Sequence, residues 1–188
     1  IGVNYAYNKN KLLKWNERLG RGSIFENYPY QMIYTYKSKG IAQTWEDVNN
    51  APYHGDYLSP GDLIMEDING DGITSSDQIA MPNVMRYVPK HDFSFDINAK
   101  WKGFDVNILF QGNAGRKNFW IDKFNETIIS PTGSALQTMH LNSWSLDNRN
   151  ALLPRLIGDE TNSGGFNQKT STFWLYSCNY LRLKNIQL

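Results

Sequence analysis

The sequence is short of several features that would narrow its function. Its single cysteine, Cys178, excludes a disulfide bond within the chain. A formal net charge of +1 gives no sign of binding to nucleic acid or to an anionic surface. No apolar run reaches the ~18 residues that a transmembrane helix needs. This absence does not exclude a membrane β-barrel, because the strands of a barrel carry apolar residues only at alternate positions.

Catalytic motifs are also missing. The chain has no Gly-x-Ser-x-Gly nucleophile elbow, no paired histidine ligands and no glycine-rich phosphate loop. Asp92 and Asp96 share one face of a predicted strand, where neighbouring acids are expected if that face borders water. His54 lies in a turn-rich stretch and receives no role. We therefore expect no enzymatic activity.

Aromatic residues are abundant instead. They make up 14% of the chain, with 11 tyrosines and 6 tryptophans, and they favour β-structure. Strand-like runs occupy residues 1–9, 30–36, 92–101, 104–111, 173–176 and 179–188. Residues 45–48 and 134–144 read as short helical segments, and residues 49–60 as irregular structure.

The clearest structural signal is a β-hairpin over residues 92–111. From Asp92 to Trp101 every odd-numbered residue is apolar and every even-numbered residue is polar, which is a strict period of two. Lys102 and Gly103 form a two-residue turn before the return strand. The resulting apolar pairs are Phe95 with Phe110, Ile97 with Ile108, Ala99 with Val106, and Trp101 with Phe104. On the other face Lys100 meets Asp105, and Asn98 meets Asn107.

The apolar face of this hairpin has two possible environments. It packs on a second sheet in a soluble sandwich, and it contacts lipid in an outer-membrane barrel. The strand length, the aromatic residues beside the tight turn and the polar opposite face fit a barrel with a wet interior. The pattern by itself does not distinguish between these two environments. In the last strand, a β-bulge near Asn185 would bring Leu181, Leu183, Ile186 and Leu188 onto one face.

A second signal lies between the early strands and the hairpin. Asp67, Asn69 and Asp71 place oxygen ligands at every second residue, and Gly72 follows where a calcium loop must turn sharply. The backbone carbonyl of Ile73 would supply the next ligand, as in the first half of an EF-hand loop. The alternative is a plain Asx-rich turn, since Asn-Gly and Asp-Gly are common turn dipeptides.

The second half of this loop departs from the EF-hand pattern. The twelfth place, which normally holds the closing carboxylate, is Gln78, and the nearest acid is Asp77 at the eleventh. Ser59-Pro60-Gly61 precedes the loop closely and excludes a helix that leads into it. We therefore expect a structural calcium staple and not a helix-loop-helix switch, with Asp77 as the closing ligand.

Four runs in this sequence, taken in order and spacing, carry a family resemblance. They are Pro60-Gly61-Asp62 with Asp67–Gly72, the hairpin end Trp101–Gly112, Asn150–Leu156, and Tyr180–Ile186. Together with Asn8–Lys11 they resemble the C-terminal part of SusC/RagA-type TonB-dependent outer-membrane transporters. The resemblance spans nearly the whole chain. Asp-x-Asn-x-Asp-Gly alone is not specific to the family.

The resemblance implies an all-β fold, in which the chain forms late strands and long extracellular loops of a large antiparallel outer-membrane β-barrel. Residues 1–188 would be part of that barrel domain and would not complete it. Within them, we expect the calcium-type loop at 67–78, the hairpin at 92–111, a long loop at 112–176 and a strand at 179–188. Because strand patterns run into both chain ends, we expect a segment of a larger protein.

The family's activity is nutrient import, so the resemblance implies uptake of oligosaccharides or peptides without covalent chemistry. The implied partners are a SusD-like surface lipoprotein, the TonB complex acting through an N-terminal region outside this chain, and outer-membrane lipid. Trp120, Trp144 and Trp174 could stack on sugar rings, or they could be girdle or loop-core residues. The alternative function is a soluble, calcium-stapled β-module that binds glycan or a protein partner.

Overall fold

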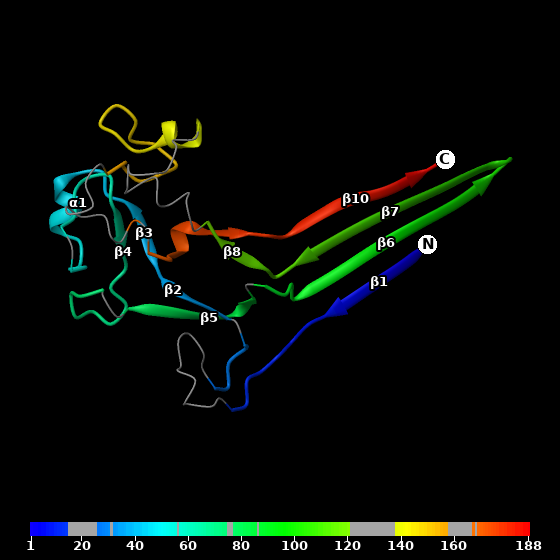
Figure 1. Cartoon of the computed structure of the whole chain (residues 1–188), viewed down its shortest axis with the longest axis horizontal. Helices are drawn as coiled ribbons and strands as arrows, with labels where there is room; N and C mark the ends of the chain where they lie inside the picture. Colours follow the sequence, from blue (N-terminus) through cyan, green and yellow to red (C-terminus); the bar gives the residue numbers. More distant parts are fainter. Residues whose placement is uncertain are drawn as a thin grey trace. The chain divides into compact units, whose positions relative to one another are not determined.

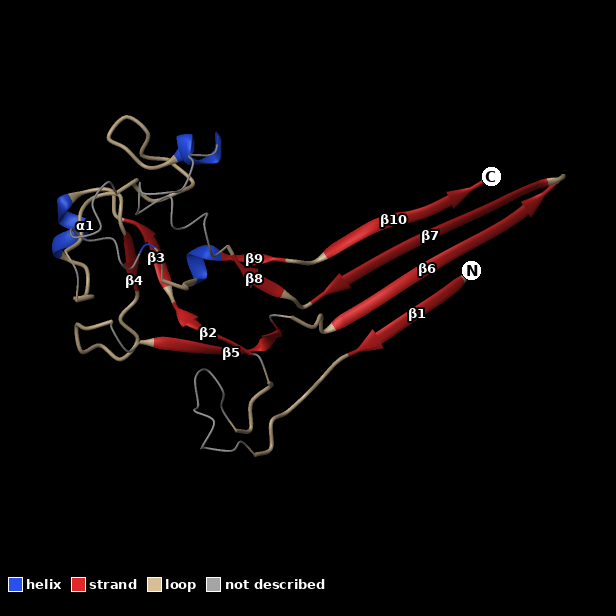
Figure 2. Ribbon diagram, viewed as in Figure 1, coloured by secondary structure: helices blue, strands red, loops and turns tan. Residues whose placement is uncertain are grey.

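A computed structural model describes most of the chain and shows an almost entirely β fold. The described residues are 1–14, 26–30, 32–55, 57–74, 77–85, 87–120, 138–157, 167 and 169–188. Its sheets are antiparallel, which confirms the all-β prediction (Figures 1 and 2). Within these residues, no helix is long and apolar enough to cross a membrane.

The chain divides into two compact units. The first, called the sheet unit, contains Ile1–Tyr34, Ala80–Asn118 and Tyr176–Leu188. The second, called the loop unit, contains Thr35–Ile79 and Phe119–Leu175.

The sheet unit is built on a four-stranded sheet with the order β1-β6-β7-β10. Its strands are β1 (Gly2–Tyr7), β6 (His91–Trp101), β7 (Phe104–Ala114) and β10 (Tyr180–Gln187). Strands β6 and β7 form the predicted hairpin, with each predicted partner pair in register. The first strand of the chain pairs with β6, so that Val3 faces Phe95 and Tyr5 faces Phe93.

Two local irregularities fix this register. Lys102 and Gly103 both have positive φ, +46° and +87°, as a type I′ hairpin turn requires. In β10 the pairing shifts between Leu183 and Asn185. This bulge, predicted near Asn185, returns Ile186 to the apolar side, opposite Ile108.

The loop unit holds its own small core beneath irregular segments. Strands β3 (Ser38–Ile41) and β4 (Leu63–Met65) pair in it. Leu63 and Met65 of β4 have no exposed surface, and Trp144, Leu153 and Trp174 are buried as well. The predicted helical turn is present as α1 (Trp45–Asn49), which begins at a capping box formed by Thr44 and Asp47.

Two further strand pairs complete the described structure, and sequence patterns located them poorly. Strand β2 (Met32–Tyr36), which was predicted, pairs with β5 (Gln78–Met85), which was not. Strands β8 (Lys117–Phe119) and β9 (Leu175–Ser177) form the other pair.

Two predicted segments differ from the observed ones. The expected strand at 173–176 begins instead as a 3-10 turn, η3 (Thr172–Trp174), and becomes extended only at Leu175. In the expected helix at 134–144, residues 134–137 lie outside the described residues. The remainder contains a 3-10 helix, η2 (Thr138–Asn142).

Candidate functional site

The calcium-type loop leaves β4 and leads to β5, and Asp67 organises its first half. The Asp67 carboxylate accepts hydrogen bonds from the backbone N–H of Gly70 at 2.6 Å and of Gly72 at 2.7 Å. Both glycines have positive φ, +80° and +81°, a conformation that side chains with a Cβ rarely adopt. The sequence therefore folds the chain around the Asp67 side chain.

The next oxygen side chains repeat this inward orientation. Asn69 Oδ1 accepts a hydrogen bond from the backbone N–H of Asp71 at 2.8 Å. Asp71 Oδ1 accepts one from the backbone N–H of Ile73 at 2.7 Å. Ile73 also forms an isolated β-bridge with Tyr53, which attaches the loop to the preceding segment.

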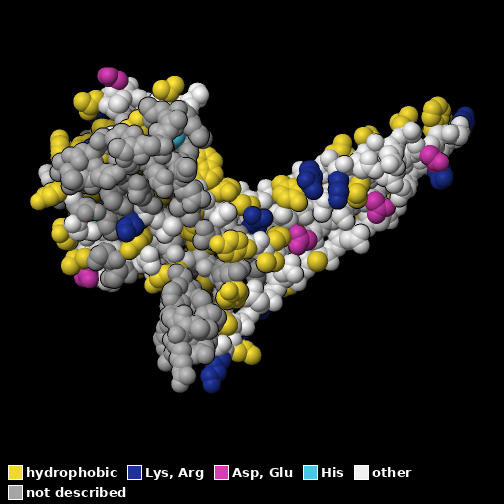
Figure 3. All heavy atoms as spheres, viewed as in Figure 1, with side chains coloured by type: hydrophobic (Ala, Val, Ile, Leu, Met, Phe, Trp, Pro, Cys, Tyr) yellow, Lys and Arg dark blue, Asp and Glu magenta, His cyan; other side chains and the backbone are white. Residues whose placement is uncertain are grey.

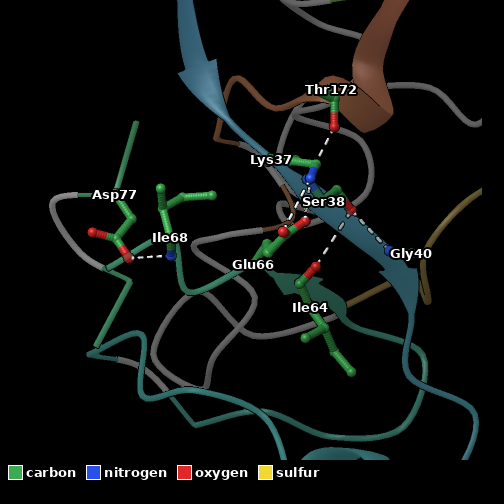
Figure 4. A network of polar contacts seen from close by, with 8 residues as sticks. All are labelled: Lys37, Ser38, Gly40, Ile64, Glu66, Ile68, Asp77 and Thr172. Carbon is green, nitrogen blue, oxygen red and sulfur yellow. Dashed lines mark hydrogen bonds and ion pairs between the residues drawn. The ribbon is translucent and has the colours of Figure 1, made fainter. Parts of the chain in front are cut away.

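Asp77 turns into the same loop although it occupies the eleventh place. Its Oδ2 accepts a hydrogen bond from the backbone N–H of Ile68 at 2.8 Å, as Figure 4 shows. The side chain is buried, with 7% of the residue exposed. Nearby, Lys37, between β2 and β3, forms an ion pair of 2.8 Å with Glu66, the residue after β4 (Figure 4).

The three carboxylates of the loop lie close together. Oxygens of Asp67, Asp71 and Asp77 lie within 4.8 Å of one another. Calcium binds oxygen at 2.3–2.6 Å, so ligands on opposite sides of the ion are ~4.6–5.2 Å apart. The donor set is all oxygen, as a hard cation prefers, and its spacing fits calcium.

Asn69 is placed less well for an ion. Its amide nitrogen bridges Asp71 Oδ2 at 3.1 Å and Asp77 Oδ1 at 3.2 Å, and it offsets their repulsion. To coordinate a cation, Asn69 needs its amide oxygen in the position that its amide nitrogen occupies here, between Asp71 and Asp77. Hydrogen bonding, first from the Gly72 N–H and then from the Gly70 N–H, lowers the pKa of Asp67 below its ordinary value, against an opposing desolvation effect.

Sequence reasoning missed a buried polar cluster in the loop unit. Asp62 has no exposed surface, and its carboxylate receives two hydrogen bonds from Arg155, at 2.7 and 3.0 Å. Asn167 Nδ2 donates to Asp62 Oδ1 at 2.9 Å, and the Ser59 N–H donates to Oδ2 at 2.8 Å. Asn167 Oδ1 in turn accepts from the Leu63 N–H at 2.7 Å. The Asp62 cluster thus joins three distant segments.

A signal for this cluster was present in the sequence. Two of the four runs that carry the family resemblance contain its opposite charges, Pro60-Gly61-Asp62 and Leu153-Pro154-Arg155. The structure brings these runs together, with the Arg155 N–H donating to the Gly61 carbonyl at 2.9 Å.

The predicted ligand-binding tryptophans lie in different environments. Trp144 and Trp174 are buried in the loop unit, with 8% and 3% exposed. Their indole N–H groups donate to Gln43 Oε1 at 2.9 Å and to the Asn167 carbonyl at 2.7 Å. This placement matches the loop-core role that the sequence had left open. Trp120 is 46% exposed and keeps a surface from which it could contact a ligand.

The four-stranded sheet has two chemically opposite faces. The apolar face is exposed or half-buried along the four strands, and Figure 3 shows hydrophobic side chains along their length. Among the exposed members of this face, the exposed fraction ranges from 36% at Phe95 to 69% at Trp101. Other members, on β6 and β7, are half-buried. Its members are Val3, Tyr5, Tyr7, Phe93, Phe95, Ile97, Trp101, Phe104, Val106, Ile108, Phe110, Leu181, Leu183 and Ile186.

The polar face carries hydrogen-bonded side chains. Lys100 Nζ lies 3.1 Å from Asp105 Oδ2, and Asn98 Nδ2 donates to Asp96 at 2.9 Å. Arg182 donates to Gln111 on the neighbouring strand at 3.3 Å. A face of this kind is compatible with contact to water.

Comparison with known proteins gives one relationship. No protein-family profile matches the chain. Over 205 aligned residues, the chain is 26% identical to TonB-dependent receptor P3 of Formosa agariphila. The match covers 97% of this chain and 18% of that protein, so the chain spans less than a fifth of its relative. The chain is similar, over nearly its whole length, to a segment of a TonB-dependent receptor.

Proposed function

We propose that this chain is a barrel segment of a TonB-dependent outer-membrane importer of the SusC/RagA type. The observation that carries the proposal is the four-stranded sheet, whose apolar face is exposed while its opposite face is polar. Such a face is unfavourable in water, and large exposed apolar surfaces mark contacts with proteins or membranes. The similarity to a TonB-dependent receptor supports the membrane as the partner.

The dimensions of the apolar face fit a bilayer. Tyr7 and His91 lie at one end of it, and Trp101 and Phe104 lie at the other. Ten residue steps along β6 cover ~34 Å. With the 35–45° tilt of barrel strands, this length corresponds to a band of about 24–28 Å, close to the ~25 Å apolar band of outer-membrane barrels.

The proposed cargo is an oligosaccharide or a peptide. It would be received from a SusD-like surface lipoprotein and imported with energy that TonB delivers from the inner membrane. Uptake by whole cells tests this function. Cells with the full-length protein should accumulate one of two fluorescent pools, oligosaccharides or peptides, and should lose that accumulation when either the protein or TonB is deleted. Accumulation of both pools that is independent of the protein would contradict the proposal.

A soluble β-module is the weaker alternative. It requires the apolar face of the sheet to be covered by other parts of the protein. In the described residues this face is exposed or half-buried along its length, including Val3 at 64% and Leu181 at 61%. The importer gives this surface lipid as a partner, whereas the soluble module needs a covering layer from elsewhere in the protein.

Within this function, the loop from Asp67 to Asp77 acts as a calcium staple. Bound calcium would offset the repulsion of three carboxylates and hold the segment between β4 and β5. Asp67, Asp71 and Asp77 would supply carboxylate oxygens, Asn69 its amide oxygen and Ile73 its backbone carbonyl.

Calcium is therefore expected to raise the melting temperature, by an amount that corresponds to about 2.7 kcal/mol when its concentration is 100 times Kd. Asp71→Ala should abolish this shift, because it removes one carboxylate ligand while the exposed Asp71 accepts only one backbone N–H, that of Ile73. Asp67 is a poorer test, since its replacement also removes the acceptor of two backbone N–H groups. Thermal unfolding with calcium and with chelator measures the effect.

Asp105→Ala is the matched control, because Asp105 is an exposed acid remote in sequence from the loop. It should keep the full calcium shift. The staple is refuted if wild-type protein shows no shift, or if Asp71→Ala retains it.

A further inference from the structure

The apolar face of the sheet ends in a cluster of aromatic and basic side chains. Tyr5 Oη lies 2.7 Å from His91 Nδ1, and the two rings are stacked with centroids 6.0 Å apart. The Tyr7 ring lies 5.3 Å from the His91 ring, and Lys90 Nζ lies 5.8 Å from the centre of the Tyr7 ring. We call these four residues the Lys90 cluster.

The backbone beneath this cluster is held firmly. The Asn8 N–H donates to the Lys90 carbonyl at 2.8 Å, and Asn8 Nδ2 donates to the Pro89 carbonyl at 3.1 Å. The Lys90 side chain starts against Gly115, where an added Cβ would lie 2.6 Å from Lys90 Cβ. The ammonium end of Lys90 is therefore presented beside Tyr7 by an ordered frame.

The positive charge of Lys90 is not matched by a carboxylate in the described part of the chain. The ion pairs there join Lys37 to Glu66, Lys100 to Asp105 and Arg155 to Asp62. Asp92 follows His91 and so lies on the opposite face of β6, where it accepts a hydrogen bond from Asn8 at 3.2 Å. Beyond Tyr7, the exposed Lys9 adds a second positive charge.

We propose that the Lys90 cluster binds the phosphate of a lipid headgroup in the outer leaflet of the membrane. The inference rests on the proposed function, which places the apolar face in lipid and the tight turn at Lys102 on the periplasmic side, since short turns face the periplasm. The Lys90 end of the face then meets the outer leaflet. Lysine supplies charge to the phosphate, while tyrosine and histidine rings lie at the headgroup level.

The opposite end of the same face provides a matched control. Lys102 Nζ lies 4.8 Å from the Trp101 ring, so both ends pair one lysine with one aromatic ring. Only the Lys90 end adds Tyr5, His91 and the nearby Lys9 to this pair. Loss of one positive charge should therefore matter at Lys90 and not at Lys102.

The test uses the full-length protein in mild detergent, titrated with monophosphoryl lipid A and followed by native mass spectrometry. Lys90→Gln should weaken binding about fivefold, the effect of one lysine charge near an anionic lipid surface. Lys102→Gln should stay within twofold of wild type. The same lipid without its phosphate should bind wild type as weakly as the intact lipid binds Lys90→Gln, and inorganic phosphate should not compete.

Equal affinities for wild type and Lys90→Gln would overturn the headgroup site, and so would an equal loss in Lys102→Gln or competition by inorganic phosphate alone. A nitroxide at position 97 reports separately on the proposed function. If it is accessible to oxygen in lipid while Lys90→Gln binds normally, only the headgroup site fails. If it contacts water, the membrane placement fails with it.

Discussion

Arg155→Met is expected to lower the free energy of unfolding of the loop unit by about 3–5 kcal/mol, because it leaves Asp62 as a buried charge without its partner. Asp62 has no exposed surface, and its carboxylate depends on the two hydrogen bonds from Arg155. The same carboxylate orders Ser59 and Asn167. Its disruption therefore loosens the contacts of the Asp62 segment with Arg155 and Asn167, which are about a hundred residues away in the sequence.

The matched control breaks an ion pair that is exposed to solvent. Lys100→Met removes the partner of Asp105, and the side chains of this pair are 83% and 67% exposed. Exposed pairs contribute about 0–1 kcal/mol, so this variant should unfold close to wild type. Denaturant unfolding followed by tryptophan fluorescence compares the two. Similar losses in both variants would show that burial of Asp62 does not set the energy of its ion pair.

Gly61→Ala should be nearly as damaging, with a loss of roughly 2–4 kcal/mol from overpacking and backbone strain together. Gly61 has φ +95°, and an added Cβ would lie 2.5 Å from Trp144 Cε3 and 2.8 Å from Arg155 Cβ. Both neighbours are held, Trp144 by its bond to Gln43 and Arg155 by Asp62. The side chain therefore cannot be accommodated by a small shift of a flexible end.

Gly40→Ala separates the two causes of this loss. Gly40 also has positive φ, +115°, but nothing lies within 4 Å of an added Cβ. This variant should lose only the backbone contribution, about 1–2 kcal/mol. Thermal and denaturant unfolding of both variants measure the difference. If Gly40→Ala is as unstable as Gly61→Ala, the contact with Trp144 contributes nothing.

The sheet could be predicted from sequence because its information is local. Strict alternation from Asp92 to Trp101 assigns each side chain to a face, and the Lys102-Gly103 turn fixes the register. The bulge near Asn185 followed from the change of parity between Leu183 and Ile186. Strands β3 and β4 are too short to show a period-two pattern. Their formation depends on packing in the loop unit.

The sites were predictable only in part. Oxygen-bearing residues at alternate positions located the loop at Asp67, but their spacing could not show whether the Asp77 side chain reaches the loop. In the structure, the hydrogen bond from the Ile68 N–H holds the Asp77 carboxylate within the loop. Asp62 and Arg155 are 93 residues apart, and local patterns do not reveal such a pairing. Burial of Trp144 and Trp174 likewise depends on contacts between distant segments.

The central claim is that one face of the sheet contacts lipid and the other contacts water. Ile97 and Asn98 are neighbours on β6 with side chains on opposite faces, and both are exposed. Each can be replaced by cysteine and labelled with a nitroxide in full-length protein in which Cys178 and any other native cysteines are replaced by serine.

Electron paramagnetic resonance of these two labels in lipid bilayers is the most direct measurement. We expect the label at position 97 to collide with oxygen, which concentrates in lipid, more than with a water-soluble nickel complex. The label at position 98 should show the reverse. Equal exposure of both labels to the nickel complex, or the opposite order, would contradict the membrane placement of this sheet.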